Sequence, residues 1–383
     1  MWQQVDQALA ATGTPVPQPS LLNKQQGLEM QKQKHASDAK KSTWLYHPAL
    51  PLQYYPIFVW PLRPLAALKF LVGRDFMWSL TLPFGIMAAL TWAYLTPPAE
   101  RMASFDIQWI GLIWLRNLIM LVLLAQALHL YFFTYRKQGD DRRFDARDYP
   151  MKSRQFAFGD QYWDNVFWSI VSGLSFWTLY EIGFLYLYAN GSLPFATWSW
   201  DVSAALAENP LWFLFLFVFV IFWQSTHFYW VHKFLHWGSV YKVVHSVHHR
   251  NVNVGPWSGI SMHWIEHIVY FSSVLIHLVI PSHPIHVIFH LQLASLGAVI
   301  FHTGFEGVVV KGRLVWLLGI FHHQVHHRYY NCNYGTEAIA WDKWFGWDHD
   351  GTEEATRRLM KELREKNKAE KMPSGRPTSP SHD

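Results

Sequence analysis

The segment LWFLFLFVFVIFWQSTHFYWVHKFLH, residues 211–236, decides the fold of this chain. Residues 211–231 are mostly apolar, and a helix of about 20 such residues is long enough to cross the hydrocarbon core of a bilayer. The segment ends in His232-Lys-Phe-Leu-His236, whose histidines are four residues apart and so share one face of a helix. It therefore predicts a membrane-spanning helix that carries two imidazoles to the membrane surface.

Two more histidine clusters follow, His245-Ser-Val-His248-His249 and His323-Gln-Val-His326-His327. They repeat the helical contact spacing, so we expect each cluster to aim its imidazoles at one point in space. Neutral imidazole is the commonest side-chain metal ligand and suits Zn, Cu, Fe and Ni. Eight convergent histidines are more than one ion needs, which indicates two metals. We expect His302, which follows the last apolar run, to be a ninth ligand.

The remaining histidines have weaker patterns, although 17 of the 22 fall between His227 and His327. A lone histidine on an apolar face is expected to be a hydrogen-bonded core residue, and we interpret His129, His277, His283, His286 and His290 in this way. Possible additional ligands, or residues that support the ligands, are His263, Glu266, His267, Glu306 and His322.

The composition indicates a membrane protein. Hydrophobic residues make up 51% of the chain and charged residues 15%, whereas a typical soluble domain has about 25% charged residues. The 22 Trp and 17 Tyr fit the aromatic belts at membrane interfaces. A net charge of +5 in so apolar a chain favours basic cytoplasmic loops over a nucleic-acid partner. The single cysteine, Cys332, excludes an internal disulfide, and the N-terminus lacks the plan of a cleaved signal peptide.

Four segments have the length and apolarity of a membrane span: Phe76–Leu95, Ile107–Tyr135, Val166–Tyr188 and Leu211–Val231. Two shorter apolar runs, 268–280 and 285–300, are separated by Pro281-Ser-His-Pro284 and predict either a hairpin that enters the membrane and returns or two thin spans. The expected fold class is an all-α integral membrane protein with about four transmembrane helices plus a short hairpin, and a cytoplasmic helical cap that holds a His-rich di-metal site.

Charged residues in the loops indicate how these spans are oriented, and two charged residues lie inside spans. The loop 136–154 carries seven basic residues, whereas the connections 96–106 and 189–210 carry only Arg101, which puts the basic loop in the cytoplasm. Four spans and an even-numbered hairpin then bring all three clusters to the cytoplasmic side. Arg116 and Glu181 lie inside spans, where charges are costly, so we expect them either to pair with each other or face the bundle interior, or to serve function.

The chain is expected to divide into four parts. They are a polar N-terminal arm (1–60), a transmembrane pair with the basic loop (61–160), the catalytic domain (161–350) and a charged, partly disordered tail (351–383). Within the tail, residues 352–371 are dense in Glu, Lys and Arg and predict a solvated helix. Residues 373–383 have the composition of a disordered end.

The ligand types argue against the commonest zinc sites. A structural zinc site usually contains cysteine, and Cys332 stands alone. The HxxxH segment lacks the glutamate that serves as general base in the HExxH motif of zinc proteases. Iron with open coordination positions suits O2 activation, although imidazole sites also accept zinc.

The histidine segments resemble those of the sterol desaturase/fatty acid hydroxylase superfamily of integral-membrane di-iron enzymes. The resemblance covers residues 160–350, where Tyr229-Trp-Val-His232-Lys-Phe-Leu-His236 is similar to the family's YWxHRxxH segment. Further similar segments are 245–249 with 262–267, 301–306, and the ending formed by 323–327, Asn333-Tyr334-Gly335 and 341–346. The chain departs from the family pattern at Ser225, Lys233 and Trp264, which leaves its branch and its substrate open.

The resemblance implies an O2-dependent lipid hydroxylase or desaturase with two Fe ions, for which Zn can substitute during purification. It implies a membrane lipid substrate, either a sterol or a long-chain acyl or sphingoid lipid, and no catalytic residue apart from the metal ligands. A separate electron donor of the cytochrome b5 or ferredoxin type is expected, because the sequence encodes none. The expected membrane is the endoplasmic reticulum of a eukaryote or the inner membrane of a bacterium. We expect Trp257, Asn333 and Tyr334 to lie near the substrate.

Two other functions remain open. One is an ether-lipid monooxygenase of the alkylglycerol type that uses a pterin. The other is a His-rich metal transporter or sensor, although a transporter should place its ligands near the bilayer midplane on broken helices. The clusters in this chain instead follow the spans at a membrane boundary.

Overall fold

The computed structural model describes residues 44–193 and 200–371, without the side chains of 369–371. The chain divides into two compact units, 1–45 and 46–383, and the helices and strands of the described residues belong to the second. Most of the expected N-terminal arm and the expected disordered end, 373–383, lie outside the described residues. The division of the chain into four parts stays a prediction.

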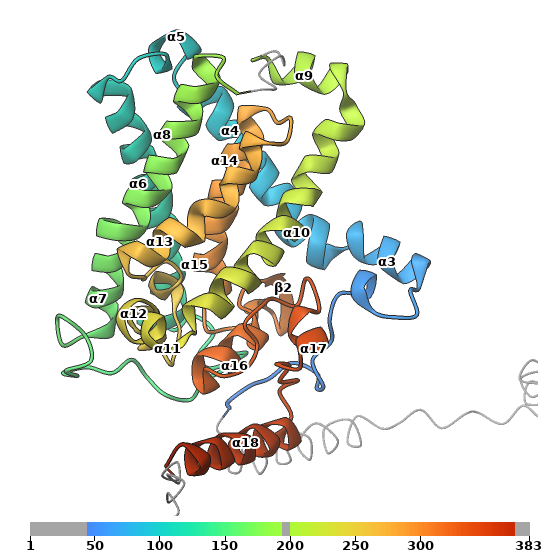
Figure 1. The fold of residues 1–383 in the computed structure, drawn as a ribbon, viewed down its shortest axis with the longest axis vertical. Helices are drawn as coiled ribbons and strands as arrows, with labels where there is room; N and C mark the ends of the chain where they lie inside the picture. Colours follow the sequence, from blue (N-terminus) through green and yellow to red (C-terminus); the bar gives the residue numbers. More distant parts are fainter. Residues whose placement is uncertain (1–43, 194–199, 372–383) are drawn as a thin grey trace, which may run out of the picture. The chain divides into compact units, whose positions relative to one another are not determined.

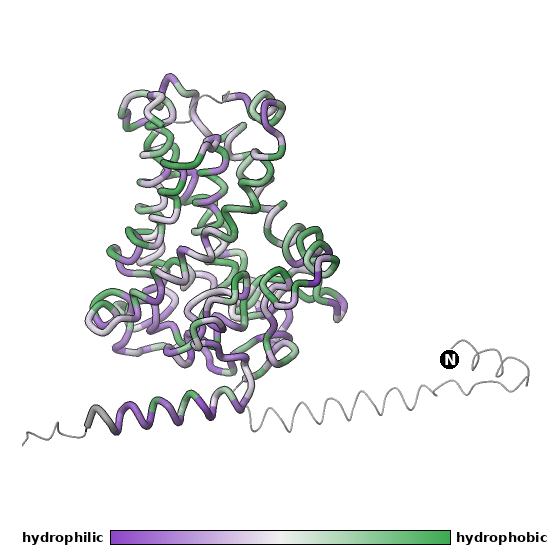
Figure 2. Tube along the Cα trace, turned by 45° about the vertical axis from the view of Figure 1, so that its right-hand side comes forward, coloured by the Kyte–Doolittle hydropathy of each residue, from purple (hydrophilic) through white to green (hydrophobic). Residues whose placement is uncertain are grey.

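Five helical segments among the described residues are long and apolar enough to cross a membrane: Pro64–Leu95, Ile107–Thr134, Gln161–Ala189, Pro210–Leu235 and Pro284–Phe301. Figure 1 shows them running alongside one another in the upper part of the view, and Figure 2 shows the same region as mostly hydrophobic. The first four confirm the predicted spans. The first begins earlier than expected, because a helix over 64–71 precedes the apolar run.

Most of these segments are built from consecutive helical pieces. The first contains α3 (Pro64–Leu71), η2 (Arg74–Thr81) and α4 (Leu82–Leu95), and the second contains α6 (Ile107–His129) and η3 (Leu130–Thr134). The third contains α7 (Gln161–Trp168), η4 (Ser169–Leu174) and α8 (Ser175–Ala189), and the fourth is α10 (Pro210–Leu235). The pieces η2, η3 and η4 are π-helical turns, which locally shift the faces that the flanking α-helices present.

The predicted hairpin is present, and its returning limb forms a fifth candidate span. The entering limb contains α13 (Trp264–Phe271) and η7 (Ser272–Leu278), and the returning limb contains α14 (Pro284–Gln292), η8 (Leu293–Gly297) and α15 (Ala298–Phe301). In the returning limb 89% of the apolar window is buried, compared with 28–50% in the other four spans. It is therefore the central helix, which explains why it tolerates His286, His290 and Gln292 within its apolar sequence.

Side-chain oxygens cap the N-termini of several of these helices. A buried ion pair links two of the helices. Asp106, Asp160 and Asn209 cap α6, α7 and α10 by accepting backbone N–H groups of the first turn. Arg116 on α6 donates to Glu181 on α8, and both side chains are almost completely buried. Pairing was one of the two expectations for these residues, and the structure bears it out.

The lower end of the bundle in Figure 1 carries shorter elements. They include α11 (Gly238–Val240), η5 (Tyr241–His245), α12 (Ser246–His249), η6 (Pro256–Ser258), α16 (Phe321–Tyr329), α17 (Trp341–Phe345) and α18 (Glu353–Lys371). The solvated helix expected over 352–371 is α18. The other short helices are η1 (Pro56–Phe58), α5 (Ala99–Met102) and α9 (Val202–Glu208).

One element departs from the all-α prediction. Strands β1 (Gly307–Val310) and β2 (Arg313–Leu317) form an antiparallel hairpin. Its turn residues, Lys311 and Gly312, have φ of +51° and +74°, which fits a tight two-residue turn of the hairpin type. The β-branched run Val308–Val310 favours a strand, but so short a run gives a weak signal beside the long apolar spans.

Candidate metal centre

All nine histidines predicted as ligands meet at the lower end of the bundle, in two neighbouring groups. Within each group the candidate ligand atoms lie within 4.8 Å of one another. Group 1 contains His232, His236, His245, His249 and His326, and group 2 contains His248, His302, His323 and His327. These groups are the ones among the described residues that could hold a metal ion.

The HxxHH clusters do not aim at one point, which corrects the sequence-based expectation. In residues 245–249, the first and last histidines enter group 1 while His248 enters group 2; in residues 323–327, the first and last enter group 2 while His326 enters group 1. Side chains four residues apart differ by about 40° around a helix, whereas adjacent ones differ by about 100°. Each i,i+4 pair therefore serves one group, and the third histidine serves the other.

The spacing between ring nitrogens fits shared coordination of one ion in each group. In group 1, the Nε2 atom of His249 lies 3.0 Å from Nε2 of both His236 and His326. In group 2, Nε2 of His323 lies 3.0 Å from that of His302 and 3.1 Å from that of His327. Two nitrogens bound at about 2.1 Å lie about 3.0 Å apart at right angles and about 3.4 Å apart at the tetrahedral angle. Nitrogens at this spacing could therefore bind a common ion.

Burial keeps these imidazoles neutral, which is the form that binds metals. It lowers the pKa of His248, His249 and His323 well below the ordinary value, and it lowers that of His302 to about 4. A neutral imidazole has one N–H and one lone pair. The orientation of each ring therefore depends on what accepts its N–H.

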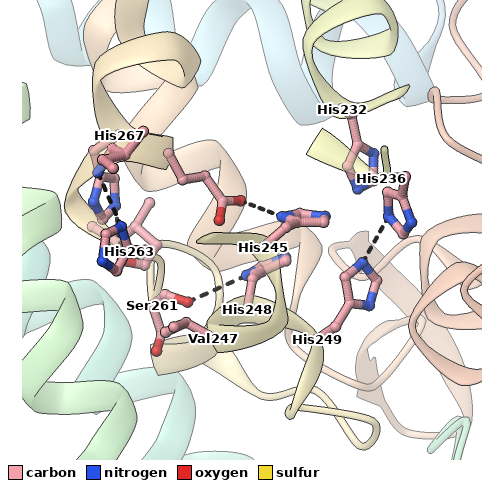
Figure 3. A network of polar contacts seen from close by, with 12 residues as sticks. His232, His236, His245, Val247, His248, His249, Ser261, His263 and His267 are labelled. Carbon is pink, nitrogen blue, oxygen red and sulfur yellow. Dashed lines mark hydrogen bonds and ion pairs between the residues drawn. The ribbon is translucent and has the colours of Figure 1, made fainter. Parts of the chain in front are cut away.

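Hydrogen-bond acceptors outside the two groups contact Nδ1 of several rings. The Nε2 atom of each of these rings then faces the other histidines of its group. His245 donates from Nδ1 to Glu266 Oε1 at 2.7 Å, and His302 donates from Nδ1 to the Ala298 carbonyl at 2.8 Å. His248 makes a longer contact of 3.4 Å with the Ser261 carbonyl, drawn in Figure 3 beside the contact between His236 and His249. Among the described residues, Nε2 of His245 is buried without a hydrogen-bond partner. A bound metal would satisfy that lone pair.

The loop after α16 supplies two more acceptors through its backbone. The carbonyls of Cys332 and Tyr334 each lie 2.6 Å from Nδ1 of a group 1 ring, that of His326 and that of His232 respectively. Asp342 holds this loop by accepting the N–H groups of Tyr334 and Gly335 at 2.8 and 2.7 Å. The sequence prediction missed Asp342 as a supporting residue, although its place in the Trp341-Asp-Lys-Trp-Phe-Gly346 segment was a usable signal.

The residues predicted as additional ligands stay outside both groups. Glu266 contacts the ring of a ligand, His245, and Glu306 pairs with Arg142 and accepts from Tyr46. His267 contacts Ser172 Oγ and the Ile260 carbonyl, while His263 caps α13. Both ring nitrogens of His322 are buried with no hydrogen-bond partner among the described residues. A direct ligand role for these five stays a prediction.

A cavity of about 410 Å3 reaches group 2. Its wall includes three group 2 histidines, His248, His302 and His323, together with mostly apolar side chains such as Phe228 and Met262. None of the five group 1 histidines lines it. Trp257, Asn333 and Tyr334 are also absent from its wall, so their proximity to a substrate stays a prediction.

Asn333 and Trp257 instead hold local structure. Asn333 donates to the carbonyls of His322 and His349 and accepts the His349 N–H. Trp257 donates its indole N–H to Gln126. Both contacts orient backbone or buried polar groups beside the two histidine groups.

Known proteins match the region of the chain that contains these histidines. Residues 217–347 match the model of the fatty acid hydroxylase family. The chain is 31% identical over 137 residues to a Delta(7)-sterol 5(6)-desaturase of Candida albicans, with 32% of the chain and 33% of the relative covered. It is 32% identical over 153 residues to a putative Delta(7)-sterol-C5(6)-desaturase of Arabidopsis thaliana, with 38% and 53% covered.

The matched region contains all nine histidines, and the matches confirm the resemblance to the sterol desaturase/fatty acid hydroxylase superfamily. The chain spans about a third of the length of the first of these curated relatives. No solved structure matches the chain.

Proposed function

We propose that this chain is a membrane di-iron oxygenase that hydroxylates or desaturates an unactivated C–H bond of a lipid, using O2 and an external electron donor. One observation carries the proposal: nine histidines, eight of them buried, form two groups, and three histidines of group 2 line a mostly apolar cavity. The fatty acid hydroxylase match and the sterol desaturase relatives support a lipid as the substrate.

The donor set suits a pair of irons. Imidazole ligands at right-angle spacing leave room for further coordination positions, which O2 chemistry requires. When bound, the two irons would supply the reduction of O2: with two electrons and two protons, one O2 converts a C–H bond to an alcohol and releases one water, or converts two adjacent C–H bonds to an alkene and releases two. The residues of the chain would hold the irons, position the substrate and exclude water.

Only histidines of group 2 line the cavity, which supports different roles for the two groups. Because His248, His302 and His323 line the cavity, the reacting carbon would lie next to group 2. Group 1 is separated from the cavity and held by Glu266 and the loop carbonyls. Phe228, in ring contact with both His232 and His323, and Met262 keep water away from that end of the cavity.

The direction of insertion follows from the loop charges. The basic segment 136–154 packs at the same end of the bundle as the histidines, since Phe144 bonds to Gly304 and Arg143 pairs with Phe305 in a β-bridge. By the positive-inside rule, this packing supports a metal centre on the cytoplasmic side. A small acidic electron carrier of the cytochrome b5 or ferredoxin type would dock on this basic face. The membrane would be the endoplasmic reticulum in a eukaryote and the inner membrane in a bacterium.

Metal analysis and lipid profiling test the proposal together. Protein purified without oxygen should contain about two irons per chain, and a host that expresses the chain should gain a lipid heavier by one oxygen or lighter by two hydrogens. His248→Ala and His326→Ala should abolish that lipid change while the protein still inserts. The matched control is His129→Ala, which removes a partly buried histidine that belongs to neither group. Iron-free protein that still forms the product would refute the proposal.

A further inference from the structure

A line of hydrogen-bonded polar side chains crosses the interior of the bundle and ends at the cavity. Tyr188 donates to the Ser282 carbonyl at 2.7 Å, and Ser282 Oγ lies 2.9 Å from His277 Nδ1. His277 Nε2 lies 3.1 Å from His290 Nδ1, and His290 Nε2 lies 2.9 Å from Gln224 Oε1. His277 and His290 are completely buried, in a region where polar groups are costly unless paired.

The donor and acceptor roles run in one direction along this line. The amide oxygen of Gln224 only accepts, so His290 must donate from Nε2. A neutral His290 then accepts at Nδ1 from His277 Nε2–H, and His277 accepts at Nδ1 from the Ser282 hydroxyl. Each ring therefore uses both of its nitrogens, and the line fixes which way the Gln224 amide points.

The last group of the line is different from the others. Gln224 lines the cavity, and among the described residues no hydrogen-bond partner is present for its amide nitrogen. The wall around Gln224 also includes Phe228, Ile221 and Leu293. Packing alone would favour an apolar residue here, because an unpaired donor in such a place is unfavourable.

We propose that Gln224 is a substrate-binding residue, whose amide donates a hydrogen bond to a neutral oxygen of the lipid, and that His290 and His277 are positioning residues that hold this amide. The inference rests on the proposed function, since it concerns the same cavity. It narrows the substrate class to apolar lipids that carry a hydroxyl or carbonyl oxygen away from the carbon that is oxidised.

Gln224 lies on the same helix as one of the group 1 histidines, at a distance from the metal centre. Gln224 and His232 are eight residues apart on one helix, which corresponds to a rise of about 12 Å. Phe228 lies midway between them and also lines the cavity. The cavity wall contains three carboxyl side chains, Asp75, Glu306 and Glu337, and no lysine or arginine among the described residues. A neutral oxygen therefore fits this cavity better than a carboxylate or a phosphate.

Paired probes that differ only in one oxygen test the assignment. The purified, metal-loaded protein is titrated with tritiated 5α-cholest-7-en-3β-ol and its 3-deoxy counterpart, and separately with tritiated octadecan-1-ol and octadecane. For at least one pair, wild type should bind the alcohol roughly 10- to 100-fold more tightly than the hydrocarbon. The preferred pair then distinguishes a sterol from a straight-chain lipid.

Variants separate the hydrogen bond from general damage. Gln224→Met keeps the length of the side chain and should bring the alcohol-to-hydrocarbon ratio close to one, and His290→Phe should lower the ratio because the amide is no longer held. The matched control is Gln292→Met, which changes another buried intramembrane glutamine that bonds to Thr91 and does not line the cavity. If Gln224→Met does not fold, Gln224→Glu keeps the oxygen that accepts from His290 and replaces the amide N–H2 by a carboxyl oxygen.

Each outcome either supports or overturns the role proposed for Gln224. A ratio that collapses in the Gln224 and His290 variants and persists in Gln292→Met supports the proposal. A ratio that persists in the Gln224 variant, or a wild-type ratio near one for both pairs, overturns it. Turnover is measured in the same preparations: selective binding without oxidation would count against the proposed function alone, and oxidation without selective binding would count against the Gln224 assignment alone.

Discussion

Replacing Glu266 with Gln should weaken metal binding in group 1 and leave group 2 almost unchanged. Glu266 accepts from His245 Nδ1 at 2.7 Å, and its second oxygen, Oε2, is buried with no hydrogen-bond partner among the described residues. Gln keeps one acceptor oxygen but removes a carboxyl group whose ionised form makes the ring a better ligand for a bound metal. It also puts an amide N–H2 into the position of Oε2, where nothing described accepts it.

These two effects have separate sizes and separate readouts. Loss of a carboxylate that supports a ligating histidine typically lowers metal affinity about 10- to 100-fold, or about 1.4–2.7 kcal/mol. The unpaired buried amide should cost about 1–3 kcal/mol of folding free energy whether or not metal is present. Affinity is measured by competition with a graded series of chelators, and folding by thermal unfolding of the metal-free protein in detergent.

A matched variant guards against a trivial result. Glu337→Gln changes another carboxyl in a largely enclosed position, on the cavity wall rather than against a ligand ring. It should leave the affinity of both metals within about twofold of wild type. The reasoning is refuted if Glu266→Gln retains both metals with wild-type affinity, or if it weakens the two metals equally.

Three other predictions concern the same bundle. Arg116→Ala or Glu181→Ala alone should destabilise the protein by about 3–5 kcal/mol, whereas replacing both with apolar residues of similar size should cost much less, as measured by unfolding in detergent. Asp342→Ala should release the loop that holds His232 and His326, so chelators should remove group 1 metal before group 2 metal. Burial raises the pKa of Glu337 to about 7, so the folded protein keeps a proton there that the unfolded chain releases near pH 4.5. The free energy of unfolding should therefore decrease as the pH rises from 4.5 to 7. Glu337→Gln should reduce this pH dependence in melting curves.

The convergence of the nine histidines could be predicted from the sequence because it depends on side-chain type and on spacing along single helices. His232 and His236 stand at the end of a span, and the parity of the spans brings the other clusters to the same end. His302 could be predicted because it follows the returning limb of the hairpin. The sharing of each HxxHH cluster between two groups also follows from helix geometry, but only when the direction of each side chain is considered as well as its face.

Other features have no signature in residue type. The carbonyls of Ala298, Cys332 and Tyr334 that hold ligand rings belong to the backbone, so any residue at those positions could supply them. The fifth candidate span was underestimated because its polar residues interrupt the apolar run, and only tertiary packing shows that they face the protein. The link between His277 and His290 joins two limbs of a hairpin, and sequence alone gave only the expectation that each is hydrogen-bonded in the core.

The interleaving of the two groups argues that they form one binuclear centre rather than two independent sites. Adjacent residues on one helix enter different groups, and the ring centroids are 5.7 Å apart for His248 and His249 and 5.8 Å apart for His326 and His327. Rings from opposite groups approach still more closely, as in the 4.9 Å between His249 and His327. A shift of α12 or α16 would therefore alter both ligand sets together. Because the cavity reaches only group 2, His248, His302 and His323 would hold the metal nearest the substrate, and the five group 1 histidines would hold the more distant one.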